Sequence, residues 1–314
     1  MTMFHLARRQ PWLITVLVFV ILAIVNTILQ PSFVDPTVMR SNLSTFLPLI
    51  LVAIGQTYVI LAGDIDLSVG SIVALVNVVT VTVITLLGGT LGAVFGGLAA
   101  GFCVGLLCGL INGFFISGLR FQPIVTTFAT GIIFAGLAIW VLPQAGLPVP
   151  DAYWQTYTES LLGLPVVLLV LIFGAIFTLV VSRLPFHTRL IAVGGNRTGA
   201  FQSGLQLGGL RIGAYMISGA FASFAALCLT GETASGDPLL GASLALSSIS
   251  AVVLGGTALA GGFGNATGSI VGALVLGMIG NVIFFAGLPF EYQTLVQGLI
   301  VLAALAGGVF VTRR

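Results

Sequence analysis

Long apolar runs separated by short polar breaks dominate this 314-residue chain. A helix that spans a membrane needs about 20 mostly apolar residues, and ten runs come close to or exceed that length. The pattern predicts spans at residues 12–29, 43–62, 68–87, 92–116, 121–142, 161–182, 211–230, 243–260, 266–286 and 292–312. Glycine and proline, which favour turns, mark most of the breaks. We therefore predict an all-α, polytopic bundle of about ten spans that forms a single transmembrane domain over residues 1–314.

The composition supports lipid as the solvent of this chain. Hydrophobic residues make up 58% and charged residues only 6%, against roughly 25% charged residues in average soluble proteins. A soluble chain this poor in charge would be unable to cover its own surface. The run that follows Arg8 and Arg9 has no small-x-small cleavage site after it, so we expect an uncleaved first span rather than a signal peptide.

The arginines predict how the bundle is oriented. With the N-terminus in the cytoplasm, the inner segments hold Arg8, Arg9, Arg120, Arg183, Arg189, Arg197, Arg211, Arg313 and Arg314. Arg40 is then the one arginine outside, and six of the eight acids share that side. Positive charge collects on the cytoplasmic side of membrane proteins. We therefore predict that both termini are cytoplasmic, which agrees with an even number of spans.

The residues that are absent exclude several function classes. The chain has no lysine, which excludes a P-loop ATPase because the phosphate-cradling motif needs one. No acid lies in the middle of a predicted span, which disfavours an ion-driven carrier. No nucleophile–base pair or metal-ligand cluster is evident, so we expect no catalytic, cofactor or metal site. What remains is a passive bundle, or one that is driven by energy from another protein.

Two inner segments are candidates for receiving that energy. The loop 183–209 mixes polar residues, glycines and the densest group of arginines. It is either a docking surface with a short helix and an exposed Phe201, or a basic loop that lies on anionic headgroups. The second segment holds Asp64, Asp66 and Ser68 before the third span. Asp66 or Ser68 is expected to cap that span, and the two acids suggest in addition a gate or a partner contact.

Glycine and amide side chains give two further predictions. A helix-packing stripe recurs every four residues in the fourth span: Gly97, Gly101, Gly105, Gly109 and Gly113. Small residues at this spacing let a neighbouring backbone approach closely. Amides inside spans either line a path for a polar solute or bond neighbouring helices; these are Gln56, Asn77, Asn112, Asn281, Gln293 and Gln297.

Three motifs together resemble the ribose-type permeases of ATP-binding-cassette (ABC) importers. They are Ala53-Ile-Gly-Gln-Thr57 with Ala62-Gly-Asp-Ile-Asp-Leu-Ser-Val-Gly-Ser71, then Ala192-Val-Gly-Gly-Asn196 leading to Ser203-Gly204, then Ala251-Val-Val-Leu-Gly-Gly-Thr257 followed by Gly261-Gly262 and Gly268. The likeness covers nearly the whole chain, with the motifs in the order of the family.

The resemblance implies a bacterial inner-membrane permease that works as a dimer. It implies a cytoplasmic ABC ATPase that binds ATP and Mg²⁺, a periplasmic sugar-binding protein, and membrane lipid as surroundings, with no nucleic acid. It also implies that the 183–209 loop forms the coupling helix, through Arg189, Gly194, Gly195, Asn196, Arg197, Phe201, Ser203 and Gly204. Arg189, Asn196 and Arg197 are then expected to pair with groups of the ATPase, and Phe201 to anchor in its apolar floor.

The chain departs from the family pattern at one place. Members usually carry Glu-Leu-Asp-Ala-Ile-Ala before the Gly-Gly motif, whereas this chain has Ala245-Leu-Ser-Ser-Ile-Ser250 and lacks both acids. This leaves open a homodimer or a heterodimer with a sister permease, and a sugar or another small polar solute. A stand-alone secondary carrier is the alternative function; a membrane-embedded enzyme or assembly factor has no residue pattern in its favour.

Overall fold

The computed structural model describes residues 12–161, 163–289, 291–292, 294–296, 298–299 and 302. Its helices are α2 (Trp12–Leu29), the 3₁₀ helix η1 (Pro31–Val34), α3 (Pro36–Leu61), α4 (Val69–Leu86), α5 (Leu91–Ser117), α6 (Pro123–Val141), α7 (Asp151–Thr158), α8 (Val166–Arg183), α9 (Pro185–Gly195), α10 (Arg197–Gln202), α11 (Leu207–Thr233), α12 (Leu244–Leu254) and α13 (Ala266–Phe285). Two short antiparallel pairs join β1 (Leu147–Pro148) to β4 (Ser235–Gly236) and β2 (Ser160–Leu161) to β3 (Leu164–Pro165).

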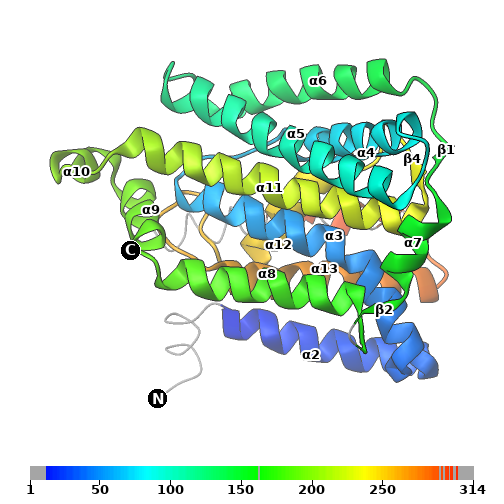
Figure 1. Cartoon of the computed structure of the whole chain (residues 1–314). Coiled ribbons are helices and arrows are strands. Elements are labelled where there is room, and N and C mark those ends of the chain that lie inside the picture. Colours follow the sequence, from blue (N-terminus) through cyan, green and yellow to red (C-terminus); the bar gives the residue numbers. More distant parts are fainter. Residues whose placement is uncertain are drawn as a thin grey trace.

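The long helices run side by side in one bundle, and the short elements gather at its two ends (Figure 1). The short helices α9 and α10 lie at one end, whereas α7 and the strand pairs lie at the other. Proline begins α3, α6 and α9, where its missing N–H costs no helical hydrogen bond. The predicted all-α polytopic bundle is confirmed.

Within the described residues, seven helices are long and apolar enough to cross a membrane: α3, α4, α5, α6, α8, α11 and α13. Each overlaps a predicted span. The helix α2 covers the first predicted span, 12–29, and its described apolar part runs from Thr15 to Leu29. The predicted span 292–312 lies largely outside the described residues.

Two predicted boundaries need correction. The prediction of a span over 243–260 is too long, because α12 has 11 residues and ends before Gly256, whose φ of +86° stops a helix. One short helix was expected within the 183–209 loop, whereas the structure has two there, α9 and α10. In both cases the number of apolar residues in a row is a poor guide to where a helix begins and ends.

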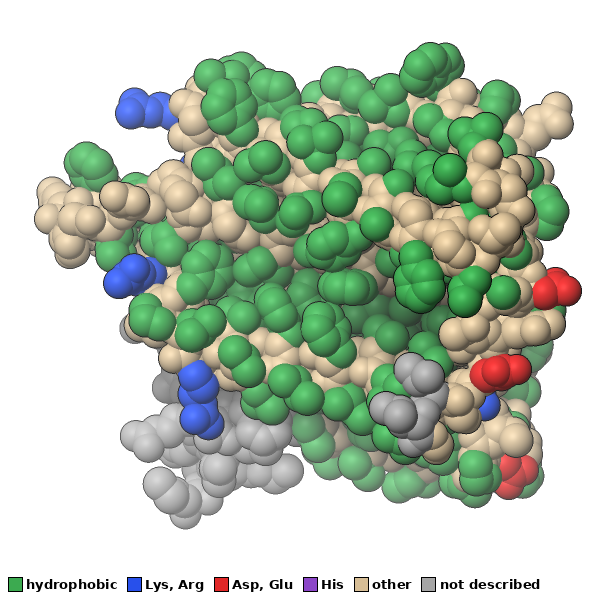
Figure 2. Space-filling model, in the orientation of Figure 1, with side chains coloured by type: hydrophobic (Ala, Val, Ile, Leu, Met, Phe, Trp, Pro, Cys, Tyr) green, Lys and Arg blue, Asp and Glu red, His purple; other side chains and the backbone are tan. Residues whose placement is uncertain are grey.

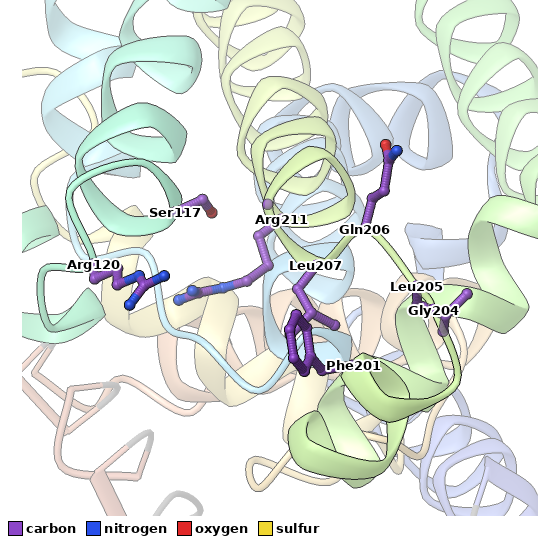
Figure 3. A pocket seen from close by; sticks show the side chains of 9 residues that line it. Ser117, Arg120, Phe201, Gly204, Leu205, Gln206, Leu207 and Arg211 are labelled. Carbon is purple, nitrogen blue, oxygen red and sulfur yellow. The ribbon is translucent and has the colours of Figure 1, made fainter.

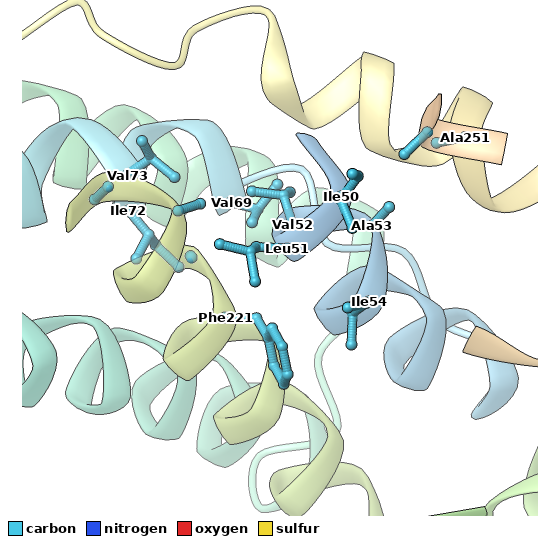
Figure 4. Close-up of a cluster of buried hydrophobic side chains, with 14 of the residues drawn as sticks. Ile50, Leu51, Val52, Ala53, Ile54, Val69, Ile72, Val73, Phe221 and Ala251 are labelled. Carbon is cyan, nitrogen blue, oxygen red and sulfur yellow. The ribbon is translucent and has the colours of Figure 1, made fainter. Parts of the chain in front are cut away.

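The helix α3 is the centre of the bundle. Nearly every side chain from Phe46 to Leu61 is buried, and this segment packs against α11, α13, α12 and α8. Figure 4 shows its Leu51 and Ile54 beside Phe221 of α11, with Val69 of α4 close by. Because α3 is enclosed on all sides, a movement at its end reaches several other helices.

The glycine stripe of α5 lies in the contact with two helices. Gly97 and Gly101 face α4, and Gly105, Gly109 and Gly113 face α11. At Gly105 an added Cβ would lie 2.7 Å from the Gly219 carbonyl oxygen, and a Cβ on Gly219 would collide with the Gly105 carbonyl. The backbones of α5 and α11 therefore touch directly, which a larger residue on either side would prevent.

Charge separates between the two ends of the bundle. Acidic side chains appear at the end that carries α7, and most of the visible arginines at the end that carries α9 and α10 (Figure 2). The surface between the ends is largely hydrophobic. This distribution suits a bundle whose sides face lipid and whose ends face water.

We predict that Gly105→Leu prevents correct assembly, since the side chain would force α5 and α11 apart. Overpacking of this kind costs about 1–3 kcal/mol, and more where backbone is the obstacle. The yield of monodisperse protein and its thermal unfolding temperature measure the effect. The matched control is Gly136→Leu in α6, where an added Cβ meets nothing within 4 Å. Equal yield and unfolding temperature for the two variants would contradict the prediction.

Candidate functional site

Three glycine-containing turns meet at the arginine-rich end of the bundle. They follow α3 (Gly63), end α9 (Gly194 and Gly195) and join α12 to α13 (Gly261 and Gly262). The backbone N–H of Gly262 donates a hydrogen bond to the Leu61 carbonyl oxygen at 3.1 Å. We call this contact the glycine junction. It brings together the three motifs on which the family resemblance was based.

No side chain fits between these turns. A Cβ on Gly194 would collide with the Leu61 carbonyl, and a Cβ on Gly262 would lie 2.5 Å from the Gly195 Cα. Gly63, Gly261 and Gly262 also have φ angles of +78°, +82° and +74°, a region that glycine occupies without strain. The junction therefore requires glycine for space at Gly194, Gly261 and Gly262, and for backbone conformation at Gly63, Gly261 and Gly262.

Asp64 forms an ion cluster directly beside the glycine junction. Its side chain is fully buried and accepts hydrogen bonds from Arg211 Nε at 2.9 Å and Nη2 at 3.0 Å. Arg197 Nη2 donates to the same carboxylate and to the carbonyl oxygens of Ala62 and Gly63 at 3.2 and 3.1 Å. The cluster ties α10 and α11 to the turn after α3.

The two arginines contribute differently because their exposure differs. The Arg211 side chain is 13% exposed and that of Arg197 is 44% exposed. A buried carboxylate is stable only while it is paired and hydrogen-bonded. Arg211, with its two-pronged contact, is therefore the main counterion of Asp64, and solvent screening weakens the pair with Arg197.

Asp66 is held in a separate polar network. Its carboxylate accepts from the Ser68 N–H at 2.9 Å, from Ser68 Oγ at 2.6 Å and from Ser218 Oγ at 3.0 Å. Ser68 Oγ in turn accepts from Asn112 Nδ2 at 2.7 Å, and Asn112 Oδ1 accepts from Thr130 Oγ1 at 2.7 Å. The network joins the α3–α4 turn to α5, α6 and α11.

The capping prediction for this turn is only half right. Ser68 is the N-cap residue of α4, but its side chain makes no cap hydrogen bond, because its hydroxyl donates to Asp66 instead. Asp66 accepts from the Ser68 N–H just before the helix. The three residues expected to form a gate or a partner contact, Asp64, Asp66 and Ser68, are all buried.

The segment 183–209, which was expected to couple to an ATPase, mixes internal and exposed groups. Asn196 caps α10 by accepting from the Gly199 N–H at 2.9 Å, and Arg197 points into the Asp64 cluster. Both side chains make contacts within the chain but both residues are also exposed, so their pairing with a partner stays a prediction. Arg189 is exposed, and Phe201 is 69% exposed.

The end of α10 shapes a pocket beside Phe201. Ser203 Oγ donates to the Gly199 carbonyl at 2.9 Å, and Gly204, with a φ of +81°, reverses the chain toward α11. A pocket of about 680 Å³ opens here between α5, α10 and α11, lined by Phe201, Arg120 and Arg211 among others (Figure 3). Its lining combines an aromatic ring with guanidinium groups, which suits a polar or acidic partner surface.

One titratable side chain, His187, lies near the start of α9. His187 of α9 is half-buried, with its ring 6.5 Å from that of Tyr58. Burial lowers the pKa of the His187 imidazole. Its charged form is thus suppressed at neutral pH, and the positive charge of this surface comes from arginine.

The amide candidates are distributed over different environments. Asn77 uses both ends of its amide, donating to Thr230 Oγ1 at 2.7 Å and accepting from the Asp237 N–H at 2.7 Å, so it acts as a brace between helices. Asn281 donates to Asn42 Oδ1 at 3.1 Å. Gln56 is fully buried and neither amide atom has a partner within the described part of the chain. Gln293 and Gln297 lie outside the described residues.

Sequence reasoning missed the role of Arg211 and Ser218. Arg211 was assigned to the edge of a loop, yet it lies in the first turns of α11. An arginine inside an apolar helix is a signal for a buried partner, and that signal was available. Ser218 carries no comparable signal, because serine is common wherever membrane helices pack closely.

The bundle and its junction define a multi-pass membrane permease. The family model for the permease component of branched-chain amino acid transport systems matches residues 38–305. Since this match covers most of the chain, the protein belongs to that family of transporter permeases. Relatives include the ribose import permease protein of Bacillus subtilis (strain 168), 36% identical over 91% of this chain and 88% of the relative.

Two further relatives point to the same branch of the family. The L-arabinose ABC transporter permease protein of Azospirillum brasilense is 31% identical over 92% of this chain and 85% of its own length. The ribose import permease protein of Escherichia coli (strain K12) is 32% identical over 91% and 89%. No solved structure matches. The resemblance to ribose-type ABC importer permeases is confirmed, and the chain is a transport subunit, not an enzyme.

We predict that Arg211→Gln destabilises the fold by about 3 kcal/mol, because loss of one partner of a buried ion pair leaves the carboxylate under-compensated. Thermal unfolding of the purified protein measures the change. The double variant Asp64→Asn with Arg211→Gln should recover part of the loss, since no buried charge is left without its counterion. Arg189→Gln, at an exposed position, is the control and should change little. An Arg211 variant as stable as this control would show that the cluster is not needed for the fold.

Proposed function

We propose that this chain carries a monosaccharide, or a similar small polar solute, across the bacterial inner membrane as the permease of an ABC importer. A periplasmic binding protein delivers the solute, and a separate cytoplasmic ATPase binds ATP and Mg²⁺ and supplies the energy. The ribose and arabinose permeases among the relatives support a sugar. The main support for energy from outside is the glycine junction, which fixes the short helices α9 and α10 to the core of the bundle.

The proposed route for this energy starts at α10. An ATPase that holds Phe201 moves α10 and α9 together, because the Asn196 cap links the two helices. The junction at Gly194 and the Arg197–Asp64 pair then pass the displacement to the turn after α3. From Asp66 it spreads through hydrogen bonds to α5, α6 and α11. The exposed Arg189 and the pocket beside Phe201 are the proposed contacts with the ATPase.

The proposed topology has ten spans, with both termini and the arginine-rich end in the cytoplasm. Charge separation between the ends supports this orientation. The dimer partner is a second copy of this chain or a sister permease. Ala245 and Ser247, where relatives in the family usually carry acids, are both buried on α12, so the missing charges concern the interior of the bundle.

Gln56 is the proposed pathway residue with the best structural support. A buried amide without partners costs free energy, and a solute with hydroxyl groups would satisfy it when the helices separate. Asn281 lies elsewhere, where its amide pairs with Asn42, and Asn77 is already braced. Gln293 and Gln297 stay candidates from the sequence alone.

We expect Phe201→Ala to leave the chain folded but to weaken its association with the ATPase. Removal of a central anchor costs about 2 kcal/mol or more, a roughly thirty-fold loss of affinity. The measurement is ATP hydrolysis by the reconstituted complex with and without the sugar-loaded binding protein, together with pull-down of the ATPase. Phe128→Ala, at a ring on α6 that is 59% exposed against 69% for Phe201, is the control. Full stimulation of ATP hydrolysis and full association with the ATPase in the Phe201 variant would place the docking surface elsewhere. In a separate assay, solute uptake into liposomes without any ATPase would favour a stand-alone carrier.

We expect cysteine probes to report the orientation directly. In a variant that lacks the three native cysteines, cysteine at position 151 or 237 should react with an impermeant maleimide in intact spheroplasts. Cysteine in place of the exposed Arg189 should react only after the membrane is permeabilised, because positive loops stay in the cytoplasm. Labelling of position 189 in sealed spheroplasts would reverse the proposed topology.

A further inference from the structure

A second cavity, of about 580 Å³, lies far from the coupling helices, where α3 begins. It is open on one side and lined by α2, α3, α8 and α13 and by the segments that precede α3 and α8. Phe19, Phe33, Leu168, Leu171 and Met278 are among its lining residues, and all of the lining is apolar except for Arg40 and Asn42. The volume falls within the ~300–1,000 Å³ range of ligand sites.

The two polar groups at this cavity are both hydrogen-bond donors with unused capacity. The Arg40 guanidinium donates one hydrogen bond, to the Glu159 backbone oxygen at 3.0 Å, and has no carboxylate within 4.0 Å among the described residues. Asn42 Oδ1 accepts from Asn281 at 3.1 Å, but its amino group is buried and lacks a partner in the described part of the chain. The site is therefore able to donate further hydrogen bonds to a ligand that offers acceptor atoms.

Donor groups beside an apolar cavity select one class of ligand. A sugar does not fit, because its hydroxyls need acceptors as well as donors and would lose their water against an apolar wall. A glycerophospholipid fits both parts: its phosphate and ester oxygens only accept, and its acyl chains are apolar. Arginine is also the side chain best suited to bind phosphate, through paired N–H groups.

We propose that this cavity holds an acyl chain of a membrane phospholipid whose phosphate is bound by Arg40. Among the arginines that the structure describes, Arg40 is the exception to the clustering of positive charge at the other end. A role in lipid binding gives this charge a function on a side that otherwise carries acids. The bound chain would complete the packing between α2 and α8, where the protein itself leaves space.

The test uses the full chain, purified and delipidated in detergent, and titrated with dioleoyl phosphatidylglycerol while thermal unfolding is followed. Native mass spectrometry counts the phospholipid that the same preparations retain. Arg40→Gln should need about ten times more lipid for half-maximal stabilisation, since a charge-assisted hydrogen bond contributes at least that factor. Leu168→Trp should fill the cavity, remove the response and lose one retained lipid.

Two control variants lie on the same helix as Leu168. Arg183→Gln removes an exposed charge at the other end of α8, and Leu179→Trp adds the same bulk at a position that is 54% exposed; both should respond like the unmodified chain. If Arg40→Gln yields no folded protein, Leu168→Trp decides, because it removes no polar contact. An equal response of all variants would mean general lipid contact and overturn the proposal. So would efficient cross-linking of lipid-free chains through a cysteine at position 39, which would place a second copy of the chain in the cavity.

Discussion

Direct contact between backbones, made possible by glycine, is the constraint on which the rest of this structure depends. In a membrane the hydrophobic effect does not drive helices to associate, because lipid tails are as apolar as the side chains. Close packing and hydrogen bonds between helices must supply that stability. The α5 stripe meets this need along the helices, where Gly105 faces Gly219. The turns around Gly63, Gly194 and Gly262 meet it at the arginine-rich end. Once these contacts are fixed, few other arrangements of the helices are left.

The buried carboxylates connect particular helices within this packing. Asp64 joins α10 and α11 to the end of α3, and Asp66 joins that same turn to α5 and α11 through hydroxyl and amide groups. Two carboxylates separated by a single residue therefore serve different sets of helices. A permease that is driven from one end needs such a division, since a displacement must enter through one group of helices and open another. The proposed path from Phe201 to the core follows this order.

The sequence predicts the long helices well, because each needs an uninterrupted apolar run of fixed length. It also predicts the glycine stripe, since a four-residue repeat places all five glycines on one face of a helix. The sequence pattern is a poorer guide where neighbouring residues do not determine the structure. The helices α9 and α10 have too few apolar residues to register as spans, and α12 ends because of one backbone angle at Gly256. Arg197 and Arg211 lie 133 and 147 residues from Asp64 along the chain, so sequence spacing was unable to reveal that both pair with this carboxylate.

The glycine junction also restricts how the sequence of this protein is able to change. In an ordinary core, a side chain that grows is accommodated when a neighbour becomes smaller, so two substitutions restore the packing that one destroys. At Gly194, Gly261 and Gly262 the neighbour is already backbone, and nothing smaller exists. A second substitution is therefore unable to restore the packing at these positions. Lineages of this chain are expected to vary around the junction, in the lining of the cavities and on the lipid-facing surface, while the junction itself passes unchanged from ancestor to descendant.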